Sequence, residues 1–107
     1  MRKTSKLLFV LVMMVNLPAL SAGVDAARQA ELLHLLKHDC GSCHGMTRKG
    51  GLGPSLLPDK LRARPQALLV NTVLEGRPGT PMPPWRGLLS EQDVHWLVEA
   101  LRQGKGL

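Results

Sequence analysis

Apolar residues recur at helical spacing in three parts of the chain, and no part shows a convincing strand pattern. The first part, residues 25–38, begins with Asp25, which could cap a helix. Its apolar face consists of Leu32, Leu33, Leu35 and Leu36. This pattern predicts a helix over 25–38 that delivers Cys40 directly after its end.

Two further helices are predicted nearer the C-terminus. Residues 65–75 begin with Pro65, which suits a first helical turn, and Gly76 would end the helix. The apolar stripe of this segment is Leu68, Leu69, Thr72 and Val73. The last helix would start after Ser90, a good N-cap, and end at Gly104. Its apolar positions are Val94, Leu97, Val98 and Leu101. The predicted fold class is therefore all-α.

The N-terminal segment has the pattern of an export signal. Three basic residues precede an unbroken apolar run over residues 7–15, and Pro18 and several small residues follow. We expect a signal peptide over residues 1–22, with cleavage between residues 21 and 26, and a mature domain over 23–107. The apolar run is shorter than the ~20 residues that span a bilayer, so no stable membrane insertion is expected. The expected location is the periplasm.

Composition indicates one small domain with little apolar bulk. Residues 23–107 hold eleven of the fourteen Lys and Arg and all eight Asp and Glu, which gives a net charge of about +3. No basic run is long enough to indicate a nucleic-acid partner. Trp85 and Trp96 are the only Trp, Tyr or Phe residues after the leader. A covalently held prosthetic group would supply the apolar bulk that so small a domain lacks.

Residues 40–44 form the pattern Cys-x-x-Cys-His, which is typical of covalent haem c attachment. Cys40 and Cys43 would add to the two vinyl groups of one haem, and His44 would be the proximal iron ligand. A disulfide between these cysteines would close a very short loop and add little stability. A thioredoxin-like motif would need a βαβ unit, and a zinc site would need a second ligand cluster that the chain lacks. With no other cysteine in the chain, we expect one haem c and one iron.

Met82 is the best candidate for the second axial ligand. Only Met46 and Met82 remain after the leader, and Met46 follows His44 too closely to reach the opposite face of a haem. A lone methionine is more often core filler, but the prolines around Met82 and the haem motif favour a ligand. The rival ligands are histidines, namely His34 and His38, which share a helix face, and His95, which we expect to face solvent.

Two loops rich in glycine and proline, residues 50–54 and 76–85, separate the predicted helices. They are either surface turns or backbone that packs flat against a haem. With the helices, the haem motif and Met82, they resemble class I cytochrome c over essentially the whole mature chain. The resemblance implies a small domain wrapped around one covalent haem, and a hydrogen bond from the His44 imidazole to the Pro54 carbonyl. It also implies that the first and last helices cross, through Leu33, Leu36, Trp96 and Leu97.

A narrower resemblance rests on residues 39–54 and 76–85, which contain Asp-Cys-Gly-Ser-Cys-His-Gly-Met, Lys-Gly-Gly-Leu-Gly-Pro and Gly-Arg-Pro-Gly-Thr-Pro-Met-Pro-Pro-Trp. These stretches look like the small NirC-type cytochromes encoded with the haem-cd nitrite reductase of denitrifying bacteria. We expect a monomeric one-electron carrier and not an enzyme, because an iron bound by both His44 and Met82 has no open position for a substrate. The resemblance implies that the carrier takes electrons from respiratory cytochromes and donates them to that reductase. An accessory role in maturation of the d-type haem stays open, because both roles need the same haem site. A peroxidase or gas-binding protein is less favoured, since no distal His or Arg pair is evident.

Four basic residues are expected to rim the haem and to form a weak positive collar for docking. They are Arg48 and Lys49 after the haem motif, and Arg77 and Arg86 around the Met82 loop. The alternative is that they are ordinary solvated surface charges.

Overall fold

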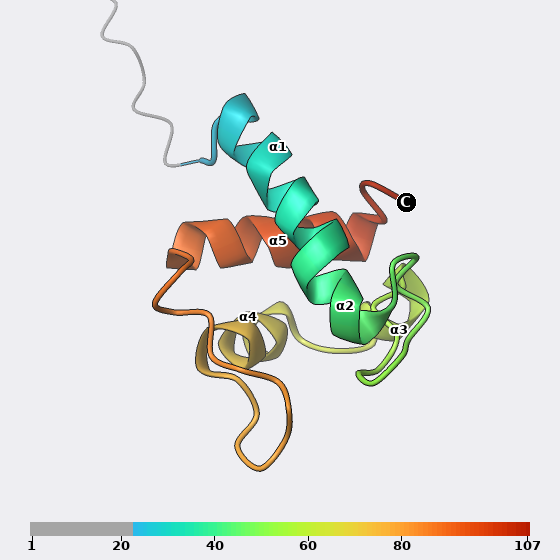
Figure 1. The fold of residues 1–107 in the computed structure, drawn as a ribbon. Helices are drawn as coiled ribbons and strands as arrows, with labels where there is room; N and C mark the ends of the chain where they lie inside the picture. Colours follow the sequence, from blue (N-terminus) through green and yellow to red (C-terminus); the bar gives the residue numbers. More distant parts are fainter. Residues whose placement is uncertain (1–22) are drawn as a thin grey trace, which may run out of the picture.

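The computed structural model describes residues 23–107, and the expected signal peptide at 1–22 lies outside the described residues (Figure 1). The described part is helical and contains no strand, as expected for an all-α chain. Its elements are α1 (Ala26–Leu35), the π-helical turn η1 (Leu36–Cys40), α2 (Gly41–His44), α3 (Pro58–Leu61), α4 (Gln66–Glu75) and α5 (Glu91–Gln103).

The first helical run is longer than the sequence pattern predicts. It starts as expected at Asp25, whose carboxylate accepts the Arg28 amide N–H at 2.8 Å. The run does not stop at His38, because α1 passes through η1 into α2 and ends only at His44. Cys40 therefore lies inside a helical run rather than after a helix. The wider π turn adds a residue just before the haem motif, and such turns are frequent at functional sites.

The middle of the chain differs from the predicted pattern in three places. Helix α4 (Gln66–Glu75) buries Val70 and Leu74 instead of the predicted stripe, of which Leu68 is 47% exposed. Helix α4 begins at Gln66, and Pro65 is its N-cap with an extended ψ of 137° rather than part of its first turn. The short helix α3 was not predicted from the sequence. It begins with Pro58, whose fixed φ suits a first helical position, and it is too short to produce an apolar period.

Helix α5 has the start and the end that the sequence predicts. The Ser90 hydroxyl accepts the Asp93 amide N–H at 3.0 Å, and the Asp93 carboxylate accepts the Ser90 amide N–H at 3.1 Å. This reciprocal arrangement is a capping box. Gly104 closes the other end in the left-handed conformation, with φ 71°. The Asp93 carboxylate also accepts two hydrogen bonds from the Arg28 guanidinium, at 2.8 and 3.2 Å, which join α5 to α1.

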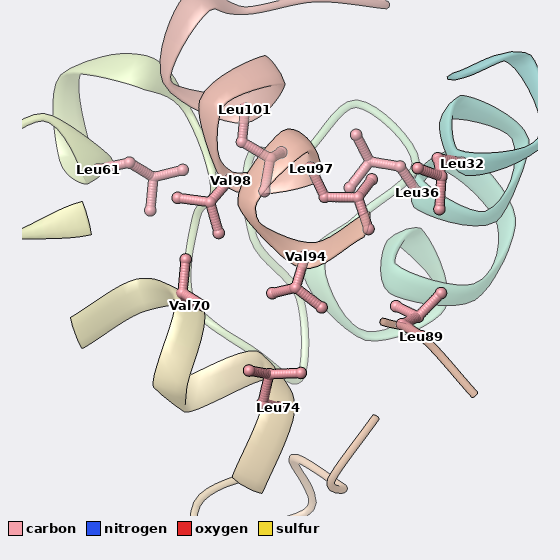
Figure 2. Packing of buried hydrophobic residues seen from close by; sticks show 10 residues of the cluster. All are labelled: Leu32, Leu36, Leu61, Val70, Leu74, Leu89, Val94, Leu97, Val98 and Leu101. Atoms are coloured by element: carbon pink, nitrogen blue, oxygen red, sulfur yellow. The ribbon is translucent and has the colours of Figure 1, made fainter. Parts of the chain in front are cut away.

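The hydrophobic core lies between α5 and the other helices. Figure 1 shows α1 crossing α5, with α4 on the other side of α5 in the view. In Figure 2, Val70 and Leu74 of α4 lie toward Val94 and Val98 of α5. The buried cluster consists of Leu32, Leu36, Leu61, Val70, Leu74, Leu89, Val94, Leu97, Val98 and Leu101.

The expected crossing of the first and last helices is present. Leu36 and Leu97 are buried in the core, and Leu33 and Trp96 are partly buried and pack against it. Burying one such leucine contributes about 1.5–3 kcal/mol relative to leaving it in water. The crossing therefore holds the helical run that carries the haem motif.

Candidate haem-attachment site

The helical run from η1 into α2 places the three side chains of the haem motif on one face. Residues three and four apart are neighbours on a helix, so Cys43 and His44 both lie beside Cys40. The two thiols are free, with no disulfide between them, and both cysteines are half-buried. Two thiols and an imidazole are thus presented together at the end of one helical run.

The Cys40 thiol is unlike the thiol of a disulfide oxidoreductase. Burial, with a smaller contribution from the Asp39 carboxylate, raises the pKa of Cys40 to about 11. Reactive Cys-x-x-Cys motifs instead lower a thiol pKa so that the thiolate forms near neutral pH. The Cys40 environment therefore argues against a thioredoxin-like redox site.

The hydrogen bond expected between His44 and Pro54 is present. The His44 Nδ1 atom lies 2.7 Å from the Pro54 carbonyl oxygen. A carbonyl oxygen can only accept, so this bond requires a proton on Nδ1, and in the neutral imidazole the lone pair is then on Nε2. A histidine in that tautomer is ready to bind a metal through Nε2.

The loop after the haem motif folds tightly against the His44 ring. Gly53 donates its amide N–H to the Cys43 carbonyl at 2.8 Å, and Gly50 donates to the His44 carbonyl at 2.9 Å. A Cβ atom on Gly53 would come within 2.7 Å of the His44 ring, so no larger residue fits there without displacing the ring. This loop is more than a surface turn, because it fixes the orientation of His44.

The loop that carries Met82 is anchored at both ends to α4. Gly76 ends α4 with φ 69°, and a Cβ atom there would lie 2.7 Å from the Met82 carbonyl oxygen. That carbonyl accepts the Arg77 amide N–H at 3.2 Å, and the Met82 amide N–H donates to the Thr80 hydroxyl at 3.3 Å. The loop closes where the Trp85 amide N–H donates to the Val73 carbonyl at 3.0 Å. Met82 is half-buried within this frame.

The rival axial ligands lie on exposed surfaces. His34 and His38 are exposed, and their ring centroids are 4.3 Å apart on one helix face, as their spacing predicts. His95 is exposed, as expected, and Met46 is about half exposed. Among residues 23–107, no group of three or more His, Cys, Asp or Glu side chains could hold a metal ion.

The prediction that four basic residues form a positive collar is wrong in part. Arg48 is only 4% exposed, and its guanidinium donates to the Lys105 carbonyl at 2.7 Å, so it is not a surface charge. Arg86 is exposed but pairs with the Glu75 and Glu91 carboxylates. Lys49 and Arg77 are exposed and make no ion pair with any residue of 23–107. Burial of Arg48 depends on the C-terminal segment folding over it, which a local sequence pattern does not reveal.

The residues of this site fit a covalently bound haem. Two free thiols lie beside one histidine, the histidine tautomer leaves Nε2 for a metal, and Gly53 keeps its ring in place. A methionine, Met82, lies in a hydrogen-bonded loop elsewhere in the chain. No helix within residues 23–107 is long and apolar enough to cross a membrane.

Comparisons with known proteins agree with this chemistry. The family described as cytochrome c oxidase, cbb3-type, subunit III matches residues 27–99. A Pseudomonas aeruginosa protein named cytochrome c55X is 63% identical over 81 residues, which are 76% of this chain and 68% of the relative.

Two solved structures have similar folds. The structure of a c-type cytochrome NirC is 61% identical with a TM-score of 0.75, over 77% of this chain and 96% of the other. The structure of the dihydro-heme d1 dehydrogenase NirN in complex with DHE is 38% identical with a TM-score of 0.61, over 65% of this chain and 15% of the other. The class I cytochrome c fold is therefore present here, and covalent haem c with iron is its cofactor.

Proposed function

The chain belongs to the c-type cytochrome family, whose members carry electrons on covalently bound haem, and we propose that it delivers single electrons to haem-cd nitrite reductase in the periplasm. The observation that carries this proposal is the 61% identity with a c-type cytochrome NirC over nearly all of that structure. The name of this relative matches the small cytochromes that the sequence of the haem motif and of the Met82 loop resembles.

The haem would be held by the residues of the helical run and its following loop. Cys40 and Cys43 would form the thioethers, and His44 would bind the iron through Nε2, while the Pro54 carbonyl keeps the imidazole oriented by accepting from Nδ1. Met82 would supply the second iron ligand. When bound, the haem supplies reversible one-electron chemistry at its iron.

The protein side of the site suits electron transfer rather than catalysis. His/Met ligation raises the reduction potential relative to other axial pairs, and two protein ligands leave no iron position open for a substrate. The hydrogen bonds of the loop around Met82 restrict movement of its backbone. We therefore assign the chain a carrier role and not an enzymatic one.

The proposed location follows from the N-terminal sequence. Residues 1–22 are proposed as a signal peptide, which would export the chain to the compartment where haem c is attached. Upstream respiratory cytochromes would reduce the carrier there, and the reductase would oxidise it. Electron-transfer partners of this kind make small, transient contacts, so we expect a monomer that docks briefly.

Stopped-flow spectroscopy tests the carrier function directly. The reduced holoprotein is mixed with oxidised haem-cd nitrite reductase, and oxidation is followed in the visible haem bands. We expect fast bimolecular oxidation that slows as salt rises, because charge steers such encounters. A rate no faster than that of an unrelated cytochrome c of similar potential would refute the reductase as acceptor.

A second candidate function is redox support of d-type haem maturation. It is favoured by the likeness to part of a protein named dihydro-heme d1 dehydrogenase. A dehydrogenase removes two electrons and two protons from its substrate, and two molecules of a one-electron carrier could take up those electrons. This role predicts rapid reduction of the oxidised holoprotein by that dehydrogenase with its substrate. It also predicts loss of mature d-type haem in a strain that lacks the gene, whereas a pure carrier to the reductase predicts a normal d-type haem content.

A further inference from the structure

Arg48 is a buried charged residue at the centre of the loop that follows the haem motif. It is only 4% exposed, and it is the one non-glycine residue of 23–107 with a positive φ, at 62°. A left-handed arginine is strained, and burying a guanidinium costs free energy. Arg48, which carries both the backbone strain and the cost of burial, lies only four residues after His44 in the sequence.

The Arg48 backbone joins the two halves of this loop. Its amide N–H donates to the Gly45 carbonyl at 2.9 Å, next to His44. Its carbonyl accepts the Leu56 amide N–H at 2.9 Å and the Ser55 hydroxyl at 3.2 Å, next to Pro54. The residue is thus tied to both sides of the contact between His44 and Pro54.

The Arg48 guanidinium forms no ion pair with a carboxylate of the described residues. Its Nη1 atom donates to the Lys105 carbonyl at 2.7 Å. By contrast, Arg28 and Arg86 each pair with two carboxylates. Burial lowers the pKa of Arg48 from its ordinary value, but an arginine side chain remains protonated in proteins. The structure therefore holds a net positive charge at a fixed, poorly solvated position.

This charge acts on one of the haem-binding residues, Cys40. Burial raises the pKa of the Cys40 thiol, and the Arg48 guanidinium partly opposes that rise, so the two side chains are electrostatically coupled. A charge that acts on Cys40 also acts on whatever is bonded to Cys40. Because Arg48 is shielded from water, salt screens its field less than that of a surface charge.

We propose that Arg48 is a positioning residue whose buried charge raises the reduction potential of the haem. Oxidation passes one electron from the iron to the redox partner and leaves the haem site with one more positive charge. A fixed cation nearby disfavours that state and so favours retention of the electron. This inference rests on the proposed attachment at Cys40, Cys43 and His44.

The test compares reduction potentials of purified holoproteins in optical redox titrations. Arg48→Gln and Arg48→Met remove the charge, and Arg48→Lys keeps it. The control is Arg62→Gln, because Arg62 is exposed and also donates to a carbonyl of the C-terminal segment, that of Arg102, at 3.2 Å. We expect lower potentials for Arg48→Gln and Arg48→Met, a potential near wild type for Arg48→Lys, and no shift for Arg62→Gln. The lowering should persist at high salt.

Folding is least at risk in Arg48→Met, since an apolar chain of similar length is cheaper to bury than a guanidinium. A second pair of variants leaves Arg48 untouched. Leu107 is exposed and lines the same groove as Arg48, so Leu107→Glu brings a carboxylate near the guanidinium and Leu107→Gln is its neutral match. We expect the Leu107→Glu potential to lie below that of Leu107→Gln at low salt.

Two results would overturn the proposal. One is a reduction potential equal to that of wild type in every neutral Arg48 variant that binds haem. If no neutral Arg48 variant binds haem, equal reduction potentials for Leu107→Glu and Leu107→Gln would have the same meaning. The other is an equal drop in Arg48→Lys and Arg48→Met, which would mean that the shape of the side chain matters and its charge does not. Failure of the wild-type chain to bind haem covalently would instead refute the proposed attachment, so the two failures are distinguishable.

Discussion

The His44 imidazole is held by two consecutive loop residues that act in different ways. The Pro54 carbonyl accepts from Nδ1 at 2.7 Å, which sets the tautomer, and Gly53 leaves just enough space for the ring beside the backbone. A hydrogen bond limits rotation of the ring and a steric wall limits its displacement. Together they aim Nε2 in one direction, which is the purpose of residues that support a metal ligand.

The residue-scale prediction concerns the second axial ligand. Met82→Ala should abolish the weak long-wavelength absorption band of the oxidised protein that is attributed to sulfur–iron charge transfer. It should also lower the reduction potential and let added ligands bind the iron. Visible spectroscopy and a redox titration of the purified holoprotein measure these changes.

Met46→Ala is the matched control, because Met46 is the other methionine of the described chain and is about half exposed. It should leave the band and the potential unchanged. If Met46→Ala abolishes the band and Met82→Ala does not, the assignment of Met82 is wrong.

At the scale of elements, α5 organises the fold through its first turn. The Ser90 hydroxyl contributes about 1 kcal/mol as an N-cap. Asp93 completes the capping box and also binds Arg28, which lies 65 residues away in the sequence. One carboxylate thus starts α5 and joins it to the helical run that carries the haem motif.

This arrangement predicts acid sensitivity. The Arg28 guanidinium, followed by the Ser90 amide, holds the pKa of Asp93 below its ordinary value. A depressed carboxyl pKa stabilises the fold above the unfolded-state pKa of about 3.9, and this stability is lost as the pH falls through the folded-state pKa. Asp93→Asn should therefore lower the free energy of unfolding at pH 7, and its difference from wild type should shrink below about pH 4. Denaturant unfolding at pH 7 and at pH 3, followed by circular dichroism, measures the two free energies of unfolding.

Glu99→Gln serves as the control for Asp93→Asn, since its carboxylate bonds only to the Gln103 amide on the same helix. It should change the free energy of unfolding by less than about 0.5 kcal/mol at pH 7. A difference between Asp93→Asn and wild type that is as large at pH 3 as at pH 7 would contradict the linkage to Asp93 ionisation.

At the scale of the whole molecule, the distribution of charge decides how the protein meets its partners. Residues 23–107 carry a modest net positive charge, but their basic side chains differ in exposure and in pairing with carboxylates. Arg48 is buried, the charge of Arg86 is offset by two carboxylates, and Lys49 and Arg77 remain exposed. The surfaces near the haem motif and near the Met82 loop are therefore less basic than the sequence indicates.

This distribution predicts unequal effects of two arginines on electron transfer. Arg77→Gln should slow oxidation by an acidic partner several-fold at low salt, because it removes an uncompensated charge. Arg86→Gln should have a smaller effect, because Glu75 and Glu91 already offset its charge. Both differences should fade at high salt. The measurement is the stopped-flow rate constant with haem-cd nitrite reductase over a range of ionic strength, and a larger effect of Arg86→Gln would contradict the prediction.

Local features of the chain could be predicted because they depend on residues that are close in sequence. Periodicity located the main helices, Ser90 and Gly104 marked the ends of α5, and residues 40–44 indicated a haem. The missed features were also local but carried weak signals. A π turn has no apolar period of its own, and α3 has only four residues. Pro65 fits an N-cap as well as a first turn, so its helix began one residue later than predicted.

The sequence by itself determined the three main helices and the haem-attachment motif, since spacing and residue types suffice for these. The pairing of His44 with Pro54 was implied by the resemblance to class I cytochrome c, and the structure contains it. Tertiary structure alone decided what each charge does. Arg48 is a buried cation only because the segment with Lys105, 57 residues away in the sequence, folds over it. Asp93 joins α5 to α1 only because the fold brings Arg28 beside it. Burial and ion pairing depend on distances through space, and these are fixed only when the apolar faces of α1, α4 and α5 pack around one core.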